Sequence, residues 1–361
     1  MSKLAKALSG AAGNAGGTEG YVEDVFSTYL YTGTGAVKTI TNGIDLDGEG
    51  GVVWIKDRSG TEKHVLAYDE NKFLSSNTTD AVTTNVNYVQ SFNSDGFQVG
   101  AASPVTASGS TFASWTFRKA EKFFDVVTYT GNGTAGRTVA HNLGSVPAMM
   151  IVKCTNASAT EWIIYHTSLG ATKYLLFTTG AAGTFTNFWN DTAPTDSVFS
   201  LGVNGQVNGN GDSFVAYLFA SDAGGYGDDG SENIIKCGSV TTDGSGNASV
   251  DVGFEPQWCL WKCVDAAGGN EHGNWRINDV IRGWPVPDSN NTFGYPSSLY
   301  ANTNGAETIS GVDGFIKSTT GFGFGQVQAN KTYIYIAIRR PMKTPTAATE
   351  VFAVSQGASG V

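Results

Sequence analysis

Three short apolar runs, each closed by a lysine, form the clearest hydrophobic pattern in this chain. They are Val52-Val-Trp-Ile-Lys56, Met149-Met-Ile-Val-Lys153 and Trp258-Cys-Leu-Trp-Lys262. An unbroken apolar run of this length between turn residues is typical of a strand buried on both faces. We therefore predict three central strands, and we expect each lysine to lay its stem along the rim and keep its ammonium in water.

An aromatic-rich run follows each of these strands several tens of residues later. The three are Phe112-Ala-Ser-Trp-Thr-Phe117, Phe214-Val-Ala-Tyr-Leu-Phe219 and Tyr333-Ile-Tyr-Ile-Ala-Ile338. In the last run tyrosine and isoleucine alternate, so as a strand it would present tyrosines on one face and isoleucines on the other. We predict that each run is the closing strand of one unit.

The spacing of turn residues indicates that these units are copies of one plan. Gly144-x-x-Pro147 precedes Lys153 and Gly253-x-x-Pro256 precedes Lys262, and the glycine and lysine are nine residues apart in both cases. In the first unit, Gly50 stands where the other two have proline. The order and spacing of the shared motifs predict three repeats.

Weaker motifs extend the comparison of the copies. Tyr31-Thr-Gly-Thr-Gly35 and Tyr129-Thr-Gly-Asn-Gly133 have the composition of hairpin turns. Downstream, Ser94-Asp-Gly-Phe97 matches Gly311-Val-Asp-Gly-Phe315, and the middle copy keeps only Val198-Phe-Ser-Leu-Gly.

The predicted fold is all-β, with three tandem β-sandwich modules of jelly-roll or Ig-like type. The short connection Arg118–Lys122 implies modules packed end to end, and the sequence leaves open whether the copies form a line or surround an axis. The predicted boundaries are 1–20 for an N-terminal anchor with a Gly-rich linker, 21–122, 123–222 and 223–341 for the modules, and 342–361 for a C-terminal tail.

Residues 1–9 form the one helix expected before the first module. Leu4 and Leu8 lie one turn apart with Lys3 and Lys6 beside them. A nine-residue helix is marginal in water on its own. We predict that Lys3, Leu4, Lys6 and Leu8 anchor the chain to a partner.

Composition supports the all-β class and limits the partners. Of the 361 residues 47 are glycine, and charged residues make up 15%, whereas about 25% is usual. The net charge of −10 argues against nucleic acid, and no apolar run is long enough to cross a membrane. The N-terminus lacks the apolar core of a signal peptide, so synthesis in a cytoplasm is expected. The four cysteines are expected to be small buried residues.

Catalytic or metal-binding signatures are not found. The four histidines have no nucleophile motif beside them. Asp228, Asp229 and Glu232 lie in a Gly-rich segment, where turn acids are the ordinary explanation, and no EF-hand loop is present. We therefore predict no catalytic residue, no metal site and no cofactor.

Aromatic side chains on loops are candidates for stacking on sugar rings. Trp284, Trp189 and Tyr226 are predicted glycan contacts of this kind. The alternative is that they pack in the core, which is the commoner role of tryptophan in a sandwich.

Several of these motifs resemble those of a known group of proteins. Tyr129-Thr-Gly-Asn-Gly133, His141-Asn-Leu-Gly-Ser-Val-Pro147, Asn208-Gly-Asn-Gly-Asp212 and Phe214-Val-Ala-Tyr-Leu-Phe-Ala220 resemble the uncharacterised repeats of structural proteins in marine tailed phages. Those proteins are usually described as tail-fibre or virion structural components. The resemblance implies a virion component, homotrimeric or otherwise homo-oligomeric, with its N-terminus towards the particle.

The leading hypothesis is a phage virion structural protein, a short tail fibre or spike-like component made in the host cytoplasm. Residues 1–20 would bind other virion proteins, and the third module would contact host surface polysaccharide. One alternative is a capsid-decoration or tail-associated protein without a ligand. A polysaccharide depolymerase ranks third, because its paired carboxylates are recognised by their separation in space, which a sequence does not give.

Overall fold

The computed structural model describes residues 20–178, 180–265, 273–286, 294–309 and 314–343. The predicted N-terminal helix and the four anchoring residues Lys3, Leu4, Lys6 and Leu8 lie outside these ranges. Most of the predicted C-terminal tail does as well.

Three six-stranded antiparallel sheets dominate the fold, and the order of strands is the same in each. In their order across the sheet, the strands of the first are β1 (Phe26–Thr32), β9 (Thr111–Arg118), β3 (Gly51–Asp57), β4 (Val65–Asp69), β5 (Lys72–Leu74) and β6 (Thr83–Thr84). The second contains β10 (Phe124–Thr130), β17 (Ser213–Phe219), β12 (Met149–Cys154), β13 (Ile163–His166), β14 (Lys173–Leu176) and β15 (Gly183–Thr184). The third contains β18 (Ile235–Thr241), β26 (Thr332–Arg339), β20 (Pro256–Cys263), β21 (Arg276–Asp279), β22 (Ser297–Tyr300) and β23 (Thr308–Ile309). We call residues 26–118, 124–219 and 235–339 lobes 1, 2 and 3.

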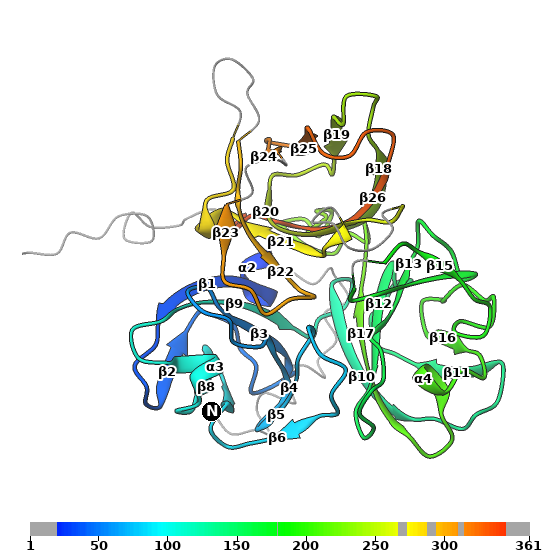
Figure 1. Cartoon of the computed structure of the whole chain (residues 1–361), viewed down its shortest axis with the longest axis horizontal. Helices are drawn as coiled ribbons and strands as arrows, with labels where there is room; N and C mark the ends of the chain where they lie inside the picture. The colour runs from blue at the N-terminus through cyan, green and yellow to red at the C-terminus, as the bar shows by residue number, and fades with distance from the viewer. Residues whose placement is uncertain (1–19, 179, 266–272, 287–293, 310–313, 344–361) are drawn as a thin grey trace, which may run out of the picture.

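Smaller sheets and short helices complete the lobes. The small sheets are β2 (Lys38–Thr41), β8 (Gly96–Val99) and β7 (Val89–Asn93) in lobe 1, β11 (Arg137–Ala140) and β16 (Val198–Leu201) in lobe 2, and β19 (Ala248–Asp251), β25 (Gly321–Gly325) and β24 (Gly314–Lys317) in lobe 3. The helices are α2 (Val22–Val25), α3 (Ser103–Thr106), α4 (Gly205–Asn208) and the 3₁₀ turn η2 (Val280–Arg282). Figure 1 shows the three lobes grouped together, with α2 near the centre.

The central and closing strands predicted from the apolar runs are confirmed. Every residue of β3, β12 and β20 is buried, because each strand has a core on both faces. In lobe 1, Val53 and Ile55 face the small sheet, whereas Val52 and Trp54 belong to a second cluster shared with the other lobes. β26 also has a core on each face. Its tyrosines belong to the separate core of lobe 3, and its isoleucines belong to the second cluster.

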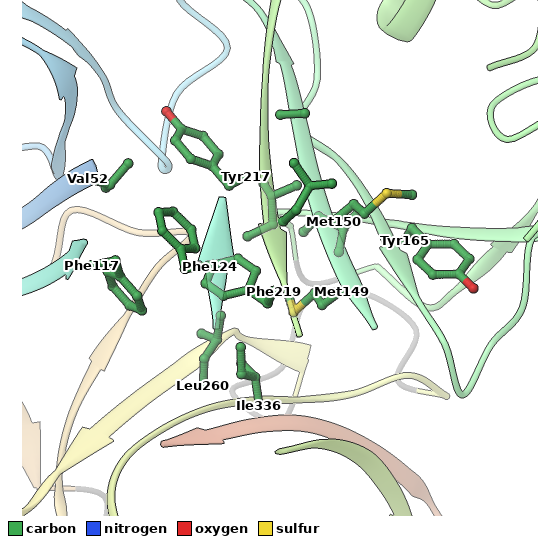
Figure 2. Packing of buried hydrophobic residues seen from close by; sticks show 14 of the residues in the cluster. Val52, Phe117, Phe124, Met149, Met150, Tyr165, Tyr217, Phe219, Leu260 and Ile336 are labelled. Atoms are coloured by element: carbon green, nitrogen blue, oxygen red, sulfur yellow. The ribbon is translucent and has the colours of Figure 1, made fainter. Parts of the chain in front are cut away.

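The second cluster is a core that all three lobes share. Each lobe contributes a residue from the start of its first strand, its central strand and the end of its closing strand: Phe26, Val52 and Phe117; Phe124, Met149 and Phe219; Ile235, Trp258 and Ile338. The ring of Phe117 lies 5.8 Å from that of Phe219 and 5.6 Å from that of Trp258. Figure 2 shows Phe117, Phe124 and Phe219 beside Leu260 and Ile336 of lobe 3.

The lobes therefore surround one approximate threefold axis and do not form a line, which are the two arrangements that the sequence left open. Three equivalent backbone hydrogen bonds close the ring: Val82 N to Thr155 O (2.8 Å), Ala182 N to Val264 O (2.9 Å) and Glu307 N to Arg58 O (2.8 Å). In each bond the acceptor lies two residues after the lysine of a central strand. The third bond joins the last lobe to the first, so the short connection between lobes 1 and 2 reflects a turn around the axis.

The two glycine-rich motifs predicted as hairpin turns have another role. β1 and β10 pair with the closing strands β9 and β17, so the motifs carry the chain from one sheet to another. A Cβ on Gly33 would lie 2.2 Å from Ala107 O, and one on Gly131 would lie 2.0 Å from Gly209 O. Glycine is needed here because two backbone segments touch.

The predicted equivalence of the Asp-Gly-Phe motifs at 95–97 and 313–315 is wrong, because they belong to strands that are not counterparts. Phe97 in β8 lies opposite Ile40 of β2, and its counterpart in lobe 3 is Phe322 in β25, which lies opposite Val250 of β19. The glycine before each of these phenylalanines has no room for a Cβ. The Asp-Gly-Phe at 313–315 leads into β24, the counterpart of β7.

Candidate functional site

An open depression of about 320 Å³ lies where the three lobes meet, and two aromatic residues of the shared core, Trp162 and Phe177, are part of its lining. We call it the axial depression. It is lined by Ser76, Asn77, Thr78, Thr79, Glu161, Trp162, Phe177, Thr178 and Asn302. Strand register makes three of the lining residues equivalent: Asn77, Thr178 and Asn302. Each lies three residues after a leucine that pairs with the neighbouring strand of its own sheet. These leucines are Leu74, Leu175 and Leu299, which pair with β4, β13 and β21. The depression thus lies on the axis.

Ring N–H groups fix the loops that line the axial depression. Trp162 Nε1 donates to Thr78 O (3.0 Å), Trp275 Nε1 to Leu176 O (2.7 Å) and His64 Nε2 to Tyr300 O (3.0 Å). Each donor is the residue immediately before its strand, β13, β21 or β4, and each bonds to the preceding lobe around the axis. The repeated bond therefore holds the rim of the depression in place.

His64 is a fixed hydrogen-bonding residue. Its Nδ1 accepts from Trp54 Nε1 at 2.9 Å, so the ring proton is on Nε2 and points to Tyr300 O. Burial lowers the pKa of His64 to about 3, which keeps the ring neutral at physiological pH. Both ring nitrogens are occupied, so His64 is not positioned as a general base.

The three lysines that end the central strands are enclosed, which contradicts the expected wet ammonium. Lys56, Lys153 and Lys262 are each 0% exposed. Lys153 Nζ donates to Thr79 O at 3.3 Å and Lys262 Nζ to Thr178 O at 3.0 Å, so two of the ammonium groups bind carbonyls of the preceding lobe. Burial lowers the pKa of each of the three to about 8. Lys153 and Lys262 thus satisfy carbonyls of residues that line the depression, whereas Lys56 Nζ donates to Asp57 O and Gly60 O of its own lobe.

The three aromatic residues predicted to contact glycans are core residues. Trp284 stacks on Phe315 with ring centroids 4.7 Å apart, and Trp189 packs edge-on against Tyr165. Tyr226 is also buried, and its hydroxyl donates to Glu121 O at 3.0 Å. None presents a ring face to solvent, so all three pack in the core, which was the alternative to glycan contact.

The acids considered for catalysis or calcium lie at the opposite end of the molecule. Asp228, Asp229 and Glu232 line a depression of about 310 Å³ with Tyr21 and three other residues. Tyr21 donates its hydroxyl proton to Asp228 Oδ1 at 2.5 Å, and Asp229 caps a turn through Ser231. Among the residues that the structure describes, no group of three or more His, Cys, Asp or Glu could hold a metal ion. The turn explanation fits Asp229, whereas Asp228 is bound by Tyr21 and Glu232 forms an ion pair with Arg339.

The four cysteines are free and buried, as expected for small core residues. No helix in the described ranges is long and apolar enough to cross a membrane.

The sequence reasoning missed the axial depression. One signal was available, since Asn77-Thr78 and Asn302-Thr303 are the same dipeptide at equivalent positions of lobes 1 and 3. It was not recognised because the strands before it are short and differ in sequence.

The fold and the axial depression define an all-β protein of three lobes around an approximate threefold axis. Residues 22–341 match the family model described as domain of unknown function DUF7483, and the chain belongs to this family. No curated protein matches the chain.

Proposed function

We propose that this protein is a structural component of a phage virion, a short tail fibre or spike-like part, built from three β-sandwich modules. Residues 1–20 attach it to other virion proteins, and copies assemble as a homo-oligomer. The resemblance of its repeats to virion structural proteins of marine tailed phages supports this proposal. Its role is structural and adhesive, not enzymatic.

The observation that carries the proposal is the difference between the two ends of the axis. Tyr21 and Met342 lie together, because the Glu23 carboxylate accepts from the backbone N–H of Met342 (3.1 Å) and of Lys343 (2.7 Å). The chain therefore enters and leaves the three-lobed body at one place, beside the part of the shared core in which Val22 and Val25 are buried with Phe26 and Phe117.

The axial depression lies at the other end. Each central strand runs from the Phe117 side of the shared core to its lysine. In lobe 1 it runs from Val52, which lies opposite Phe117, to Lys56, and four residues of strand span about 13 Å. A body with its attachment point at one end and an open polar depression at the other suits a part that is held by a particle and faces outward.

Deleting residues 2–20 tests the attachment. The shortened chain should fold with the circular dichroism spectrum and melting behaviour of the full chain, yet be missing from purified particles by mass spectrometry. The matched control is the full chain with Thr178→Trp, which alters only the depression and should still be incorporated. Incorporation of the shortened chain would contradict the anchor, and absence of the full chain from particles would refute the virion role.

The same particles separate the other two hypotheses. Labelling on the capsid, with no binding to host surface glycans, would favour a decoration protein. Release of reducing ends from host polysaccharide by the purified chain would establish a depolymerase.

A further inference from the structure

Three polar groups around the axial depression have no hydrogen-bond partner among the described residues: the amide NH₂ of Asn77, the hydroxyl proton of Thr178 and the carboxylate of Glu161. Asn77 accepts through Oδ1 from His64 N at 3.0 Å, which leaves its Nδ2 without a partner in the described part of the chain. Thr178 Oγ1 accepts from Gly180 N at 3.3 Å, and its own proton is donated to no described residue. The Glu161 carboxylate accepts no hydrogen bond from any described residue.

The surroundings of these groups are already fixed. Glu161 N donates to Gln206 Oε1 at 2.7 Å, and Asn302 Oδ1 accepts from Trp275 N at 2.8 Å. The rim carbonyl of Thr78 is held by Trp162. Donors and acceptors held in this way lose little freedom on binding, so each hydrogen bond to a ligand contributes more of its energy to affinity.

The lining excludes two classes of ligand. Glu161 is the one charged residue in the lining of the depression. The ammonium groups of Lys153 and Lys262 lie behind the lining, where they are fully buried and bound to the carbonyls of Thr79 and Thr178. The charge that faces the open depression is therefore negative and disfavours an anion. A hard cation such as Ca²⁺ takes six to eight oxygen ligands, and one carboxylate with scattered hydroxyls and amides does not supply a charged cage.

What remains is an uncharged ligand with many hydroxyl groups. A carboxylate, an amide N–H and a hydroxyl complement sugar hydroxyls, and the buried rings of Trp162 and Phe177 give the floor an apolar part. A volume of about 320 Å³ is at the lower end of the range of about 300 to 1,000 Å³ for small-molecule sites. We infer that the axial depression binds one uncharged sugar unit of a larger glycan, with Asn77, Glu161 and Thr178 as its hydrogen-bonding residues. The inference rests on the proposed function only for the source of that glycan, the host surface.

Saturation-transfer NMR with the full chain tests this directly. The probes are the methyl glycosides of glucose, galactose, mannose and N-acetylglucosamine, with methyl glucuronide as the anionic comparison. At least one uncharged glycoside should bind and the glucuronide should not. Glu161→Gln should weaken binding about 10-fold or more, because a hydrogen bond to a charged group is lost. Thr178→Trp should abolish it by filling the depression.

The matched controls are Glu49→Gln and Thr172→Trp, which make the same changes at exposed positions away from the depression and should leave binding unchanged. Melting curves of all four variants show whether the fold is intact. Three results would each overturn the inference. They are failure of every uncharged glycoside to bind, wild-type affinity in both Glu161→Gln and Thr178→Trp, and binding of the glucuronide at this site. A chain that is in the particle but binds no glycoside contradicts this inference alone, whereas one that binds a glycoside but is absent from the particle contradicts the virion role alone.

Discussion

Trp284 illustrates how a residue that looks functional in sequence can be structural. Its neighbours Gly283 and Pro285 suggested an exposed loop, but the indole lies parallel to the Phe315 ring, at an interplanar angle of 9°. It also contacts Phe322 in the core of lobe 3. The loop is present, and the side chain turns inward because an indole buries a large apolar area.

Replacing Trp284 with alanine should therefore affect stability. We expect Trp284→Ala to lower the free energy of unfolding by about 3–5 kcal/mol, the usual cost of deleting a large buried ring. Trp284→Phe keeps a ring stacked on Phe315 and should cost clearly less. Urea unfolding followed by tryptophan fluorescence and circular dichroism measures both. Unchanged stability of the alanine variant, with loss of glycan binding, would restore the original prediction.

His64 should make the protein sensitive to acid. Burial lowers its pKa to about 3, against about 6.5 in the unfolded chain. Between these values the unfolded state binds a proton that the folded state does not, so the free energy of unfolding falls as pH falls below about 6.5. One such group contributes a slope of at most about 1.4 kcal/mol per pH unit.

The His64→Gln variant isolates this contribution, since glutamine does not titrate. Urea unfolding of both proteins between pH 7 and pH 4 should give curves that converge towards acid, because only the wild type loses the His64 contribution. Parallel curves would mean that His64 is protonated in the folded state.

At the scale of elements, the contact between lobes 3 and 1 differs from the other two. Lobes 1 and 2 and lobes 2 and 3 are joined by the chain, whereas lobe 3 meets lobe 1 without a covalent link. Only this contact contains a buried ionic network among the described residues. Arg282 Nε binds Asp279 Oδ2 at 2.7 Å, Arg282 also binds Glu307 (3.2 Å), and Glu307 in turn binds Arg58 of lobe 1 at 2.6 Å. Trp115 of lobe 1 donates to Asp279 Oδ2 at 2.8 Å.

Arg282→Met should therefore open the ring at its closing contact. It leaves the buried Asp279 carboxylate without its cation, and removal of one partner of a buried pair costs about 3–5 kcal/mol. Lys72→Met breaks the exposed pair with Asp69 and should cost about 1 kcal/mol or less. Chemical unfolding measures both. Similar losses for the two variants would mean that the network does not hold lobe 3 to lobe 1.

The sequence predicted the elements better than their arrangement. The apolar runs ending at Lys56, Lys153 and Lys262 located the central strands because burial on both faces leaves an unbroken pattern. That pattern does not say what covers each face, so the shared core was not foreseen. The axial depression was missed for a similar reason, since Asn77, Glu161 and Thr178 are distant in sequence and meet only when the lobes close around the axis.

For the whole molecule, the shared core determines how the protein unfolds. Modules in a row with small contacts could unfold one at a time. Here Phe117 of lobe 1 touches both Phe219 of lobe 2 and Trp258 of lobe 3, so losing one lobe exposes the apolar surface of the other two. The lobes should therefore unfold together.

Calorimetry of the full chain should show one cooperative transition, with the van't Hoff enthalpy close to the calorimetric enthalpy. Phe117→Ala should move the whole transition to lower temperature without splitting it, because the substitution weakens contacts of all three lobes at once. The matched variant Phe97→Ala lies in the separate core of lobe 1 and does not touch the shared cluster. Hydrogen exchange should show that β3, β12 and β20 share one opening free energy within each protein, and that this value is lower in Phe117→Ala than in the wild type. Three separate transitions, or protection lost in lobe 1 alone when Phe117 is replaced, would mean that the lobes are independent domains that only touch at the axis.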